Sequence, residues 1–143
     1  MPKIIVIHGP MGSGKSTISA RLKEVLPRFV LVDRAYIKDT MLKSVKKENR
    51  ELALQLSADA VYLIVERLLR EGYNLIIQEF TRGPIEKRFK EGNEIFSFYL
   101  DCSLETCQKR DLERQKNHVR PEVVQAMFEK NAHPKEGDII INT

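Results

Sequence analysis

Short apolar runs alternate with longer amphipathic stretches along the whole chain. The apolar runs predict buried strands at residues 3–8, 29–33, 73–79, 94–101 and 138–141. Between them, apolar positions at helical spacing predict helices at residues 14–26, 36–46, 50–71, 85–90, 103–114 and 121–130. The longest helix is expected to bury one broad apolar face, made of Leu52, Leu56, Ala60, Leu63, Val65 and Leu68. Strands that alternate with helices predict an α/β fold, a five-stranded parallel sheet with helices on both faces.

Local signals predict where some helices begin and end. Ser103 is expected to cap the amino terminus of the helix that follows it, and Pro121 is expected to open the last helix. Gly72 is placed to end the longest helix in a left-handed conformation. With 143 residues the chain is long enough for a sizeable core, so residues 1–143 are expected to form one domain.

Composition narrows the class of protein. Hydrophobic residues make up 42% of the chain and charged residues 31%, which is typical of a globular protein and not of a disordered one. The net charge of +4 suits a protein that handles phosphates but is too small to argue for a nucleic-acid partner. Cys102 and Cys107 are the two cysteines, and we expect them to be reduced in a cytoplasmic protein. We expect neither a signal peptide nor a membrane-spanning segment.

The turn after the first predicted strand has the phosphate-binding loop pattern, two glycines separated by four residues and followed by Lys and Ser. Its glycines let backbone N–H groups surround a phosphate, and the following helix adds the positive end of its dipole. Lys15 would reach the β- and γ-phosphates, and the Ser16 hydroxyl would bind Mg²⁺. The residues expected to bind a nucleoside triphosphate here are Gly9, Gly12, Ser13, Gly14, Lys15, Ser16 and Thr17.

Together with Asp33 and two later arginines, this loop makes the chain resemble the small P-loop kinases. The resemblance is to the adenylate-kinase-like branch, which includes polynucleotide 5′-hydroxyl kinases and gluconate kinases, and it extends over nearly the whole length. It implies a three-layer P-loop NTPase fold and a short arginine-bearing lid at about residues 110–122 that closes over the nucleotide. It also implies transfer of the γ-phosphate from ATP, with Mg²⁺, to a small-molecule hydroxyl or phosphate.

Asp33 ends the second predicted strand. The resemblance implies that an Asp at this place touches the acceptor hydroxyl, and a carboxylate there can orient the hydroxyl and take its proton. The alternative is a helix N-cap, since a helix follows, and the two roles can coexist. Related kinases often have an Arg three residues further on, where this chain has Tyr36; Arg34 and Lys38 are the nearby cations.

The third predicted strand ends on Gln78 and Glu79. The resemblance implies an Asp here that holds Mg²⁺ through its water shell, and strict alignment puts Gln78 at that position. Neighbouring side chains point to opposite faces unless the strand has already ended. Because an outer-shell carboxylate is chemically acceptable to Mg²⁺, we expect Glu79 to serve the metal, with Gln78 as the alternative.

Arg110 and Arg114 are four residues apart, which places both on one face of a helix. The resemblance implies that Arg110 lies against the adenine and Arg114 contacts the phosphates. A guanidinium suits both tasks, because it stacks on rings and donates paired hydrogen bonds to phosphate. The plainer interpretation is a charged helix face, since Lys109, Asp111 and Glu113 surround the two arginines.

Three functions remain open at this point. The first is a small-molecule kinase. The second is a polynucleotide 5′-hydroxyl kinase, in which a nucleic-acid backbone would contact Lys38, Lys43, Lys46 and Lys47. The third is a nucleotide-binding regulatory NTPase, which ranks last because the chain has no Asn-Lys-x-Asp guanine motif. The protein is expected to be a monomer or a homodimer.

Overall fold

Five parallel strands form the central sheet of the computed structural model, which describes residues 1–79, 84–114, 119–131 and 133–143. The strands are β1 (Lys3–His8), β2 (Phe29–Asp33), β3 (Asn74–Glu79), β4 (Glu94–Asp101) and β5 (Ile139–Asn142). Their order across the sheet is β2-β3-β1-β4-β5, and every neighbouring pair is parallel. The strand that leads into the phosphate-binding loop is therefore the central one, with its carboxyl end at the crevice where open α/β sheets bind ligands.

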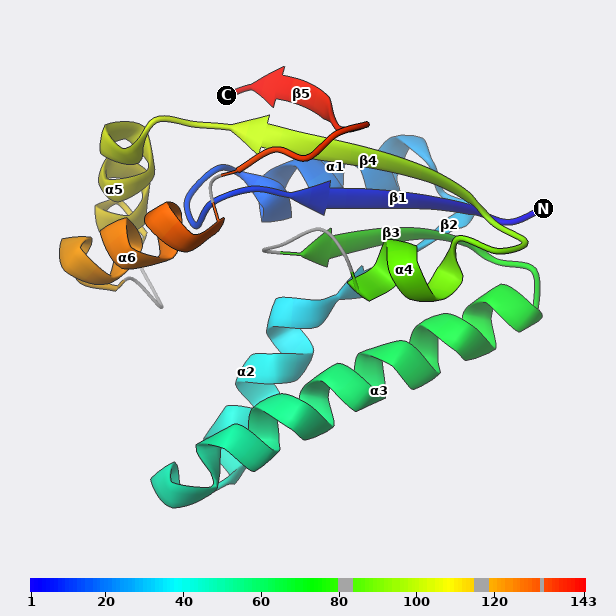
Figure 1. Cartoon of the computed structure of the whole chain (residues 1–143), viewed down its shortest axis with the longest axis horizontal. Coiled ribbons are helices and arrows are strands. Elements are labelled where there is room, and N and C mark those ends of the chain that lie inside the picture. Colours follow the sequence, from blue (N-terminus) through cyan, green and yellow to red (C-terminus); the bar gives the residue numbers. More distant parts are fainter. Residues whose placement is uncertain (80–83, 115–118, 132) are drawn as a thin grey trace.

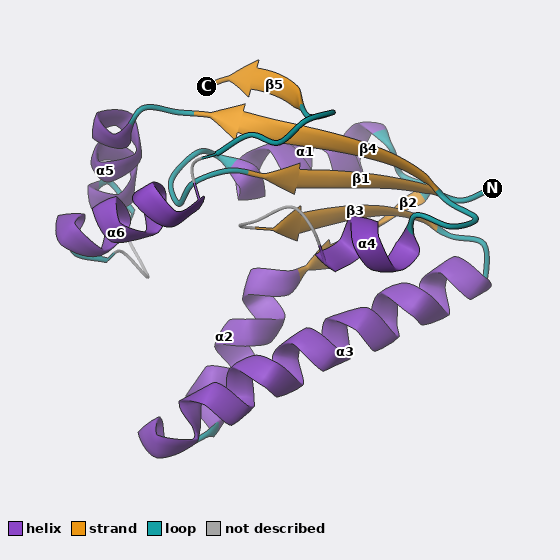
Figure 2. Ribbon diagram, in the orientation of Figure 1, coloured by secondary structure: helices purple, strands orange, loops and turns teal. Residues whose placement is uncertain are grey.

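Helices cover both faces of this sheet, as the alternating pattern predicts. They are α1 (Lys15–Val25), α2 (Arg34–Ser44), α3 (Arg50–Arg70), α4 (Pro84–Phe89), α5 (Leu104–Leu112) and α6 (Pro121–Asn131), with a short 3₁₀ helix η1 (Lys47–Asn49) between α2 and α3. Figure 1 shows α1 behind the sheet and α4 in front of it, with α5 and α6 beside the carboxyl ends of the strands. The strand layer lies between two helical layers (Figure 2), so the three-layer fold is confirmed.

Each face of the sheet has its own apolar core, because successive side chains of a strand point to opposite faces. On one face, Ile4 and Val6 of β1 pack with Val61 and Val65 of α3 and with Ile85 of α4. On the other face the buried residues Ile7, Ile76 and Leu100 pack against half-buried apolar residues that include Ile18 and Leu22 of α1. The position of the loop is thus determined by two layers of packing around the central strand.

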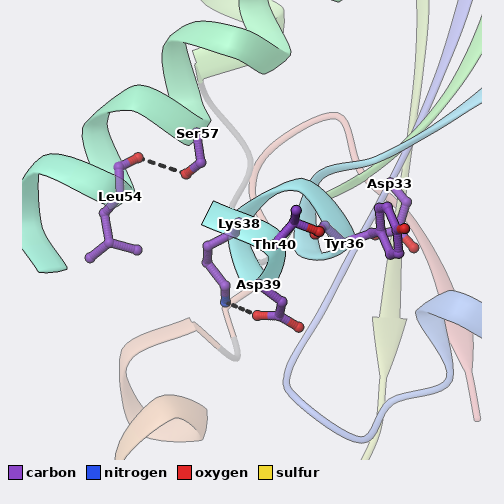
Figure 3. Close-up of polar contacts among 7 residues, drawn as sticks. All are labelled: Asp33, Tyr36, Lys38, Asp39, Thr40, Leu54 and Ser57. Carbon is purple, nitrogen blue, oxygen red and sulfur yellow. Dashed lines mark hydrogen bonds and ion pairs between the residues drawn. The ribbon is translucent and has the colours of Figure 1, made fainter. Parts of the chain in front are cut away.

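The buried face of α3 differs from the predicted one. Its buried residues are Ala53, Ser57, Val61 and Val65, whereas Leu52, Leu56 and Leu63 are exposed, Leu63 to 66%. The prediction for these three leucines was wrong because α3 packs against α2 as well as the sheet, and small side chains allow two helices to approach closely. The Ser57 hydroxyl turns back to donate to the Leu54 carbonyl at 2.8 Å (Figure 3).

The predicted helix ends are confirmed at Ser103 and Gly72. Ser103 Oγ accepts the Thr106 N–H at 3.2 Å, and Gly72 has φ +81° just after α3. The helix expected from residue 36 begins at Arg34, because Asp33 Oδ1 accepts the Tyr36 N–H at 3.0 Å and caps the helix two residues earlier. Within the described residues, no helix is both long and apolar enough to cross a membrane.

Candidate nucleotide and phosphoryl-transfer site

The phosphate-binding loop lies directly against the backbone of β4 and α5. A Cβ added to Gly9 would lie 2.8 Å from the Leu100 carbonyl oxygen, and one added to Gly12 would lie 2.6 Å from the Cys107 carbonyl oxygen. Gly12 also has φ +85°, a left-handed conformation that side chains disfavour. Only glycine fits these two positions, and the loop is thereby held as a cradle at the amino terminus of α1.

The Lys15 ammonium group lies inside this cradle. Its Nζ donates to the carbonyl oxygens of Gly9 and Pro10, both at 2.8 Å. Burial lowers the pKa of Lys15 to about 8; the thiols of Cys107 and Cys102 act in the opposite direction, and the nearby charges of Arg114 and Lys38 lower it further. A cation held among carbonyl oxygens at the start of a helix is suited to bind a phosphate.

Ser16 and Gln78 meet at the edge of the cradle. The Ser16 hydroxyl donates to Gln78 Oε1 at 3.2 Å, and Gln78 is only 5% exposed. In the sheet Gln78 is in register with Ile7 of β1 and with Asp33 of β2. The strand continues to Glu79, whose side chain lies outside the described part of the structure. The alternative named from the sequence, Gln78, is thus the residue in contact with Ser16, and the assignment of Glu79 to the metal stays a prediction.

The residues around Ser16 fit a magnesium ion bound together with nucleotide. The Ser16 residue is exposed, so its hydroxyl oxygen is accessible, and the Gln78 amide supplies a second oxygen beside it. In the ranges that the structure describes, no group of three or more His, Cys, Asp or Glu could hold a metal by itself. Mg²⁺ is usually bound through few protein oxygens, with phosphates and waters completing its shell.

Arg110 lies over the same loop. Its Nη1 is 3.4 Å from the carbonyl oxygens of both Gly12 and Ser13 and 3.6 Å from Cys102 Sγ. These contacts are long for hydrogen bonds, so the guanidinium is held only loosely. Sequence reasoning placed this arginine near the nucleotide, and the structure places it beside the cradle.

Arg114 lies two residues beyond the end of α5, so the helix expected over residues 103–114 ends too early to hold both arginines on one face. Its charge nevertheless acts on Lys15. Its Nη1 is 3.7 Å from Oδ1 of the buried Asp111. Asp111 Oδ2 also accepts the Val119 N–H at 2.8 Å, which joins the end of α5 to the segment before α6. Residues 115–118 of the predicted lid lie outside the described residues. Arg110 in α5 and Arg114 just beyond the end of that helix are therefore both near the loop.

Asp33, Tyr36 and Lys38 lie where α2 begins. Figure 3 shows the Tyr36 ring beside Asp33, with Lys38 and Asp39 on another side of the helix. Asp33 is half-buried and Tyr36 is 71% exposed, so the ring is open to a bound molecule. The Lys38 ammonium is 4.0 Å from Asp39 Oδ1. Asp33 acts as the N-cap through Oδ1.

The end of β1 has a buried contact between a histidine and an aspartate that the sequence did not predict. His8 Nε2 at the end of β1 lies 3.1 Å from Asp138 Oδ2, and both side chains are buried. Burial raises the pKa of Asp138, but hydrogen bonds from the Lys135 backbone and from the His8 and Ser97 side chains outweigh it, so the pKa is lowered. The pair joins the central strand to the segment before β5. No local sequence signal could reveal it, because its partners are at opposite ends of the chain.

Of the predicted site residues, the structure brings the loop, Ser16, Arg110 and Arg114 together, and it places Asp33 beside Gln78 in the sheet. Ser13 is buried and its N–H closes a turn with the Pro10 carbonyl at 3.1 Å, whereas Thr17 is exposed. A parallel five-stranded sheet with this loop after its central strand is the architecture of the small P-loop kinases.

Comparison with known families agrees with this class. Residues 5–133 match the model of the AAA domain family, so the chain belongs to that family. Among curated proteins, none matches the sequence significantly.

Solved structures share the fold at low sequence identity. A candidate kinase from Chloroflexus aurantiacus has a TM-score of 0.78 and 18% identity over 99% of this chain and 84% of its own. A gluconokinase from Sinorhizobium meliloti has a TM-score of 0.67 and 16% identity over 99% of this chain and 82% of its own. A chain of the Pnkp1/Rnl/Hen1 RNA repair complex has a TM-score of 0.75 and 20% identity over 91% of this chain, which spans only 45% of that longer one.

Proposed function

We propose that this protein is an ATP- and Mg²⁺-dependent kinase that transfers the γ-phosphate to a hydroxyl or phosphate of a small molecule. The observation that supports this most strongly is the cradle, in which Gly9 and Gly12 leave no room for side chains and the Lys15 ammonium lies among loop carbonyls. Bound Mg²⁺ would neutralise phosphate charge; Ser16 would hold it, together with Glu79 or, as the alternative, Gln78.

On the nucleotide side, each residue has a task that its place in the fold supports. Lys15 would exchange its two carbonyl partners for phosphate oxygens, since a phosphate is the stronger acceptor for an ammonium group. Arg110 and Arg114 would turn from the loop and from Asp111 toward the phosphates or the base, as residues of the lid. An arginine added to such a site is worth about 10³–10⁵ in rate.

On the acceptor side, Asp33 would orient the attacking hydroxyl. Its Oδ1 holds the Tyr36 N–H, which fixes the carboxylate, while Oδ2 accepts the proton as the hydroxyl oxygen bonds to the γ-phosphorus. The bond between that phosphorus and the bridging oxygen breaks, and ADP leaves. Asp33 lies next to Gln78 across two neighbouring strands, which are about 4.8 Å apart in a sheet.

The direct test is a screen for acceptor-dependent ADP release. Nucleosides, nucleotides, sugars, sugar acids and 5′-hydroxyl oligonucleotides would each be supplied with ATP and Mg²⁺. Lys15→Ala is the blank, and Lys87→Ala, which removes an exposed lysine of α4, is the matched control. We expect one acceptor class to raise ADP release well above the blank, with the control variant behaving as the wild type. ADP release that no acceptor raises would contradict the kinase and favour the regulatory NTPase.

A polynucleotide kinase is the second candidate, supported by the fold shared with the RNA repair chain and by a basic hollow. A cavity of about 230 Å³ between α2 and α3 is lined by Leu42, Val45, Lys46, Lys47 and Arg50. A nucleic-acid strand bound there would release counterions, so its affinity would fall steeply with salt. Titration of a 5′-hydroxyl oligonucleotide at several salt concentrations separates the two candidates, because a small acceptor would show a much weaker dependence.

A further inference from the structure

Two cysteines lie in contact behind the phosphate-binding loop, and the proposed reaction uses neither of them. Cys102 directly follows β4, Cys107 lies in α5, and a hydrogen bond joins their side chains. Both are free thiols in one apolar cluster, with Cys102 4% exposed and Cys107 completely buried. They are the only two cysteines of the chain, so each has one possible partner within the same molecule.

The start of α5 explains why the two thiols meet. Ser103 caps this helix, so Cys102 is the residue before the cap and Cys107 is the fourth residue of the helix. Side chains at these two positions often pack against each other and determine the angle at which the chain enters a helix. In this protein the two side chains are thiols, and a bond between them would act on the entry into α5.

The thiol pair touches the phosphate-binding loop in three ways. The main-chain carbonyl oxygen of Cys107 would lie 2.6 Å from a Cβ added to Gly12. Arg110 Nη1 lies 3.6 Å from Cys102 Sγ and 3.4 Å from the Gly12 carbonyl oxygen. The half-buried side chain of Met11 packs against the cluster that contains both cysteines. A movement of the pair would therefore displace atoms that contact the loop.

The two sulfurs have different surroundings. Arg110 Nη1 lies beside Cys102 Sγ and can pair with negative charge that forms there. Burial raises the pKa of Cys107 to about 12, the hydrogen bond and charge of Cys102 raise it further, and the charges of Lys15 and Arg110 act in the opposite direction. Cys102 also has the small exposed area that Cys107 lacks. Cys102 is thus suited to attack an oxidant, and Cys107 to act second as a protonated thiol.

Two carboxylates of the same segment oppose negative charge on sulfur. Asp101 precedes Cys102 but is exposed, so solvent screens its charge. Asp111 is buried one turn beyond Cys107, but its oxygens are engaged by the Val119 N–H at 2.8 Å and by Arg114 at 3.7 Å. The charged group in contact with Cys102 Sγ is the Arg110 guanidinium.

We propose that Cys102 and Cys107 form an oxidation site, at which a peroxide produces an intrachain disulfide that weakens the binding of nucleotide phosphates in the adjacent loop. The Cys102 thiolate attacks one peroxide oxygen, the O–O bond breaks, and the leaving hydroxide takes up the proton that Cys102 released, which gives a sulfenic acid and water. The Cys107 sulfur then attacks Cys102 Sγ, the S–O bond breaks, and the leaving hydroxide takes the Cys107 proton as a second water. The two sulfurs lose two electrons in total, and these reduce the two peroxide oxygens.

The effect on the loop follows from the contacts of the pair. A covalent bond brings two sulfurs closer than a hydrogen bond does, so it would shift the Cys107 main chain relative to Gly12. The Cys102 sulfur would also lose the ability to carry negative charge beside Arg110. Both changes disturb the surroundings of the phosphates. The effect on binding rests on the proposed function, whereas formation of the disulfide does not.

The first test is chemical and needs no nucleotide. Reduced protein would be treated with hydrogen peroxide, alkylated and analysed by mass spectrometry. We expect the loss of two hydrogen atoms per chain and a disulfide that joins the peptides of Cys102 and Cys107. In Cys107→Ser, dimedone should trap a sulfenic acid at Cys102, whereas in Cys102→Ser the remaining thiol should stay unmodified. Absence of the disulfide, or disulfides only between chains, would overturn the proposal.

The second test measures affinity for ADP with Mg²⁺ by calorimetry. Oxidation of the wild type should lower this affinity at least about fivefold, and dithiothreitol should restore it. The double variant Cys102→Ser/Cys107→Ser is the matched control and should bind ADP equally before and after peroxide. An equal loss in the control, which dithiothreitol does not reverse, would assign the effect to oxidation of Met11 and overturn the proposal.

An intrachain disulfide that leaves ADP affinity unchanged would also overturn it. If circular dichroism shows that the serine variants do not fold, the wild type decides alone, through the mass measurement and through reversal by dithiothreitol. Reduced wild type that binds no ADP refutes the proposed function and with it the effect on binding. The mass measurement still decides in that case whether the pair is an oxidation site.

Discussion

In the phosphate-binding loop, backbone touches backbone: Gly9 lies against the Leu100 carbonyl and Gly12 against the Cys107 carbonyl, with no space for another atom. In the α2–α3 region, by contrast, side chains face solvent, among them Tyr36 and Leu63. The loop is defined by main-chain atoms, which every residue has. The α2–α3 region is defined by the particular side chains that it exposes. The difference explains why the nucleotide side of the site is evident from a short motif while the acceptor side is not.

The two regions also respond differently to substitution. A larger side chain in the loop would overlap neighbouring main-chain atoms and distort them. A substitution at an exposed position of α2 or α3 would contact only solvent and should change the free energy of unfolding little. If this contrast is right, loop variants should lose both stability and nucleotide binding, and variants near Asp33 should change only the choice of acceptor. The following predictions test the contrast, from the largest expected effect to the smallest.

Gly12→Ala should have the largest effect. Its Cβ would overlap the Cys107 carbonyl oxygen at 2.6 Å and would force an alanine into φ +85°. Strain and overlap together should lower the free energy of unfolding by about 4 kcal/mol. Gly72→Ala is the matched control, because Gly72 has φ +81° but open space around it, and it should cost about 1 kcal/mol. Urea denaturation of both variants measures the difference, and equal losses would contradict the role of backbone contact.

Asp138→Asn should lower the free energy of unfolding by about 2 kcal/mol at pH 7, because it removes the buried carboxylate that lies 3.1 Å from His8 Nε2. The pKa of Asp138 is lowered, so its stabilising contribution is complete above the ordinary carboxyl pKa and is lost as the pH falls through the lowered one. Denaturation at neutral and at acid pH should therefore show the wild type and the variant converging in acid. Asp59 on α3 is exposed and accepts a hydrogen bond from Gln55, so Asp59→Asn should change stability by less than about 0.5 kcal/mol.

ATP affinity should fall above pH 8, by up to about 1.4 kcal/mol per pH unit. The Lys15 pKa of about 8 in the free protein rises when phosphates surround the ammonium group, so binding takes up a proton between the two pKa values. Calorimetry in buffers of different ionisation enthalpy measures this uptake. Lys15→Arg stays charged throughout and should abolish the uptake; persistence of proton uptake in that variant would assign it to another group.

Tyr36→Ala should have the smallest effect on folding, less than about 0.5 kcal/mol, because the ring is 71% exposed. Its proximity to Asp33 predicts a raised KM for the acceptor, with the KM for ATP unchanged. Tyr73→Ala, an exposed tyrosine just before β3, is the matched control and should change neither constant. Thermal denaturation and steady-state kinetics provide the two measurements. An altered KM for ATP would show that the two regions are not separate.

The strands and most helix ends could be predicted from the sequence, because period-two and period-3.6 patterns and the residues Ser103 and Gly72 are local signals. The cradle could be predicted too, since its glycines, Lys15 and Ser16 are adjacent in the chain. The buried face of α3 could not, because the choice among its apolar positions depends on where α2 packs. The helical period is matched equally well by the exposed Leu52, Leu56 and Leu63 and by the residues that are buried.

The other features that the sequence could not predict depend on contacts between segments that are distant along the chain. Whether Gln78 or Glu79 faces Ser16 depends on how far β3 extends, and alternation along a strand cannot decide this. The His8–Asp138 pair joins segments that are close only after the sheet has formed. Such features follow from strand order, for which the sequence has no local pattern.

The contacts of Gly12 have a consequence for how this sequence can change. The atoms that exclude a side chain there belong to the main chain of residue 107, which would be the same if Cys107 were any other amino acid. No second substitution at that position can make room, so a lesion at Gly12 should have no suppressor among side-chain changes in α5. Any library that seeks new acceptors should leave this glycine alone and vary the solvent-facing positions of α2.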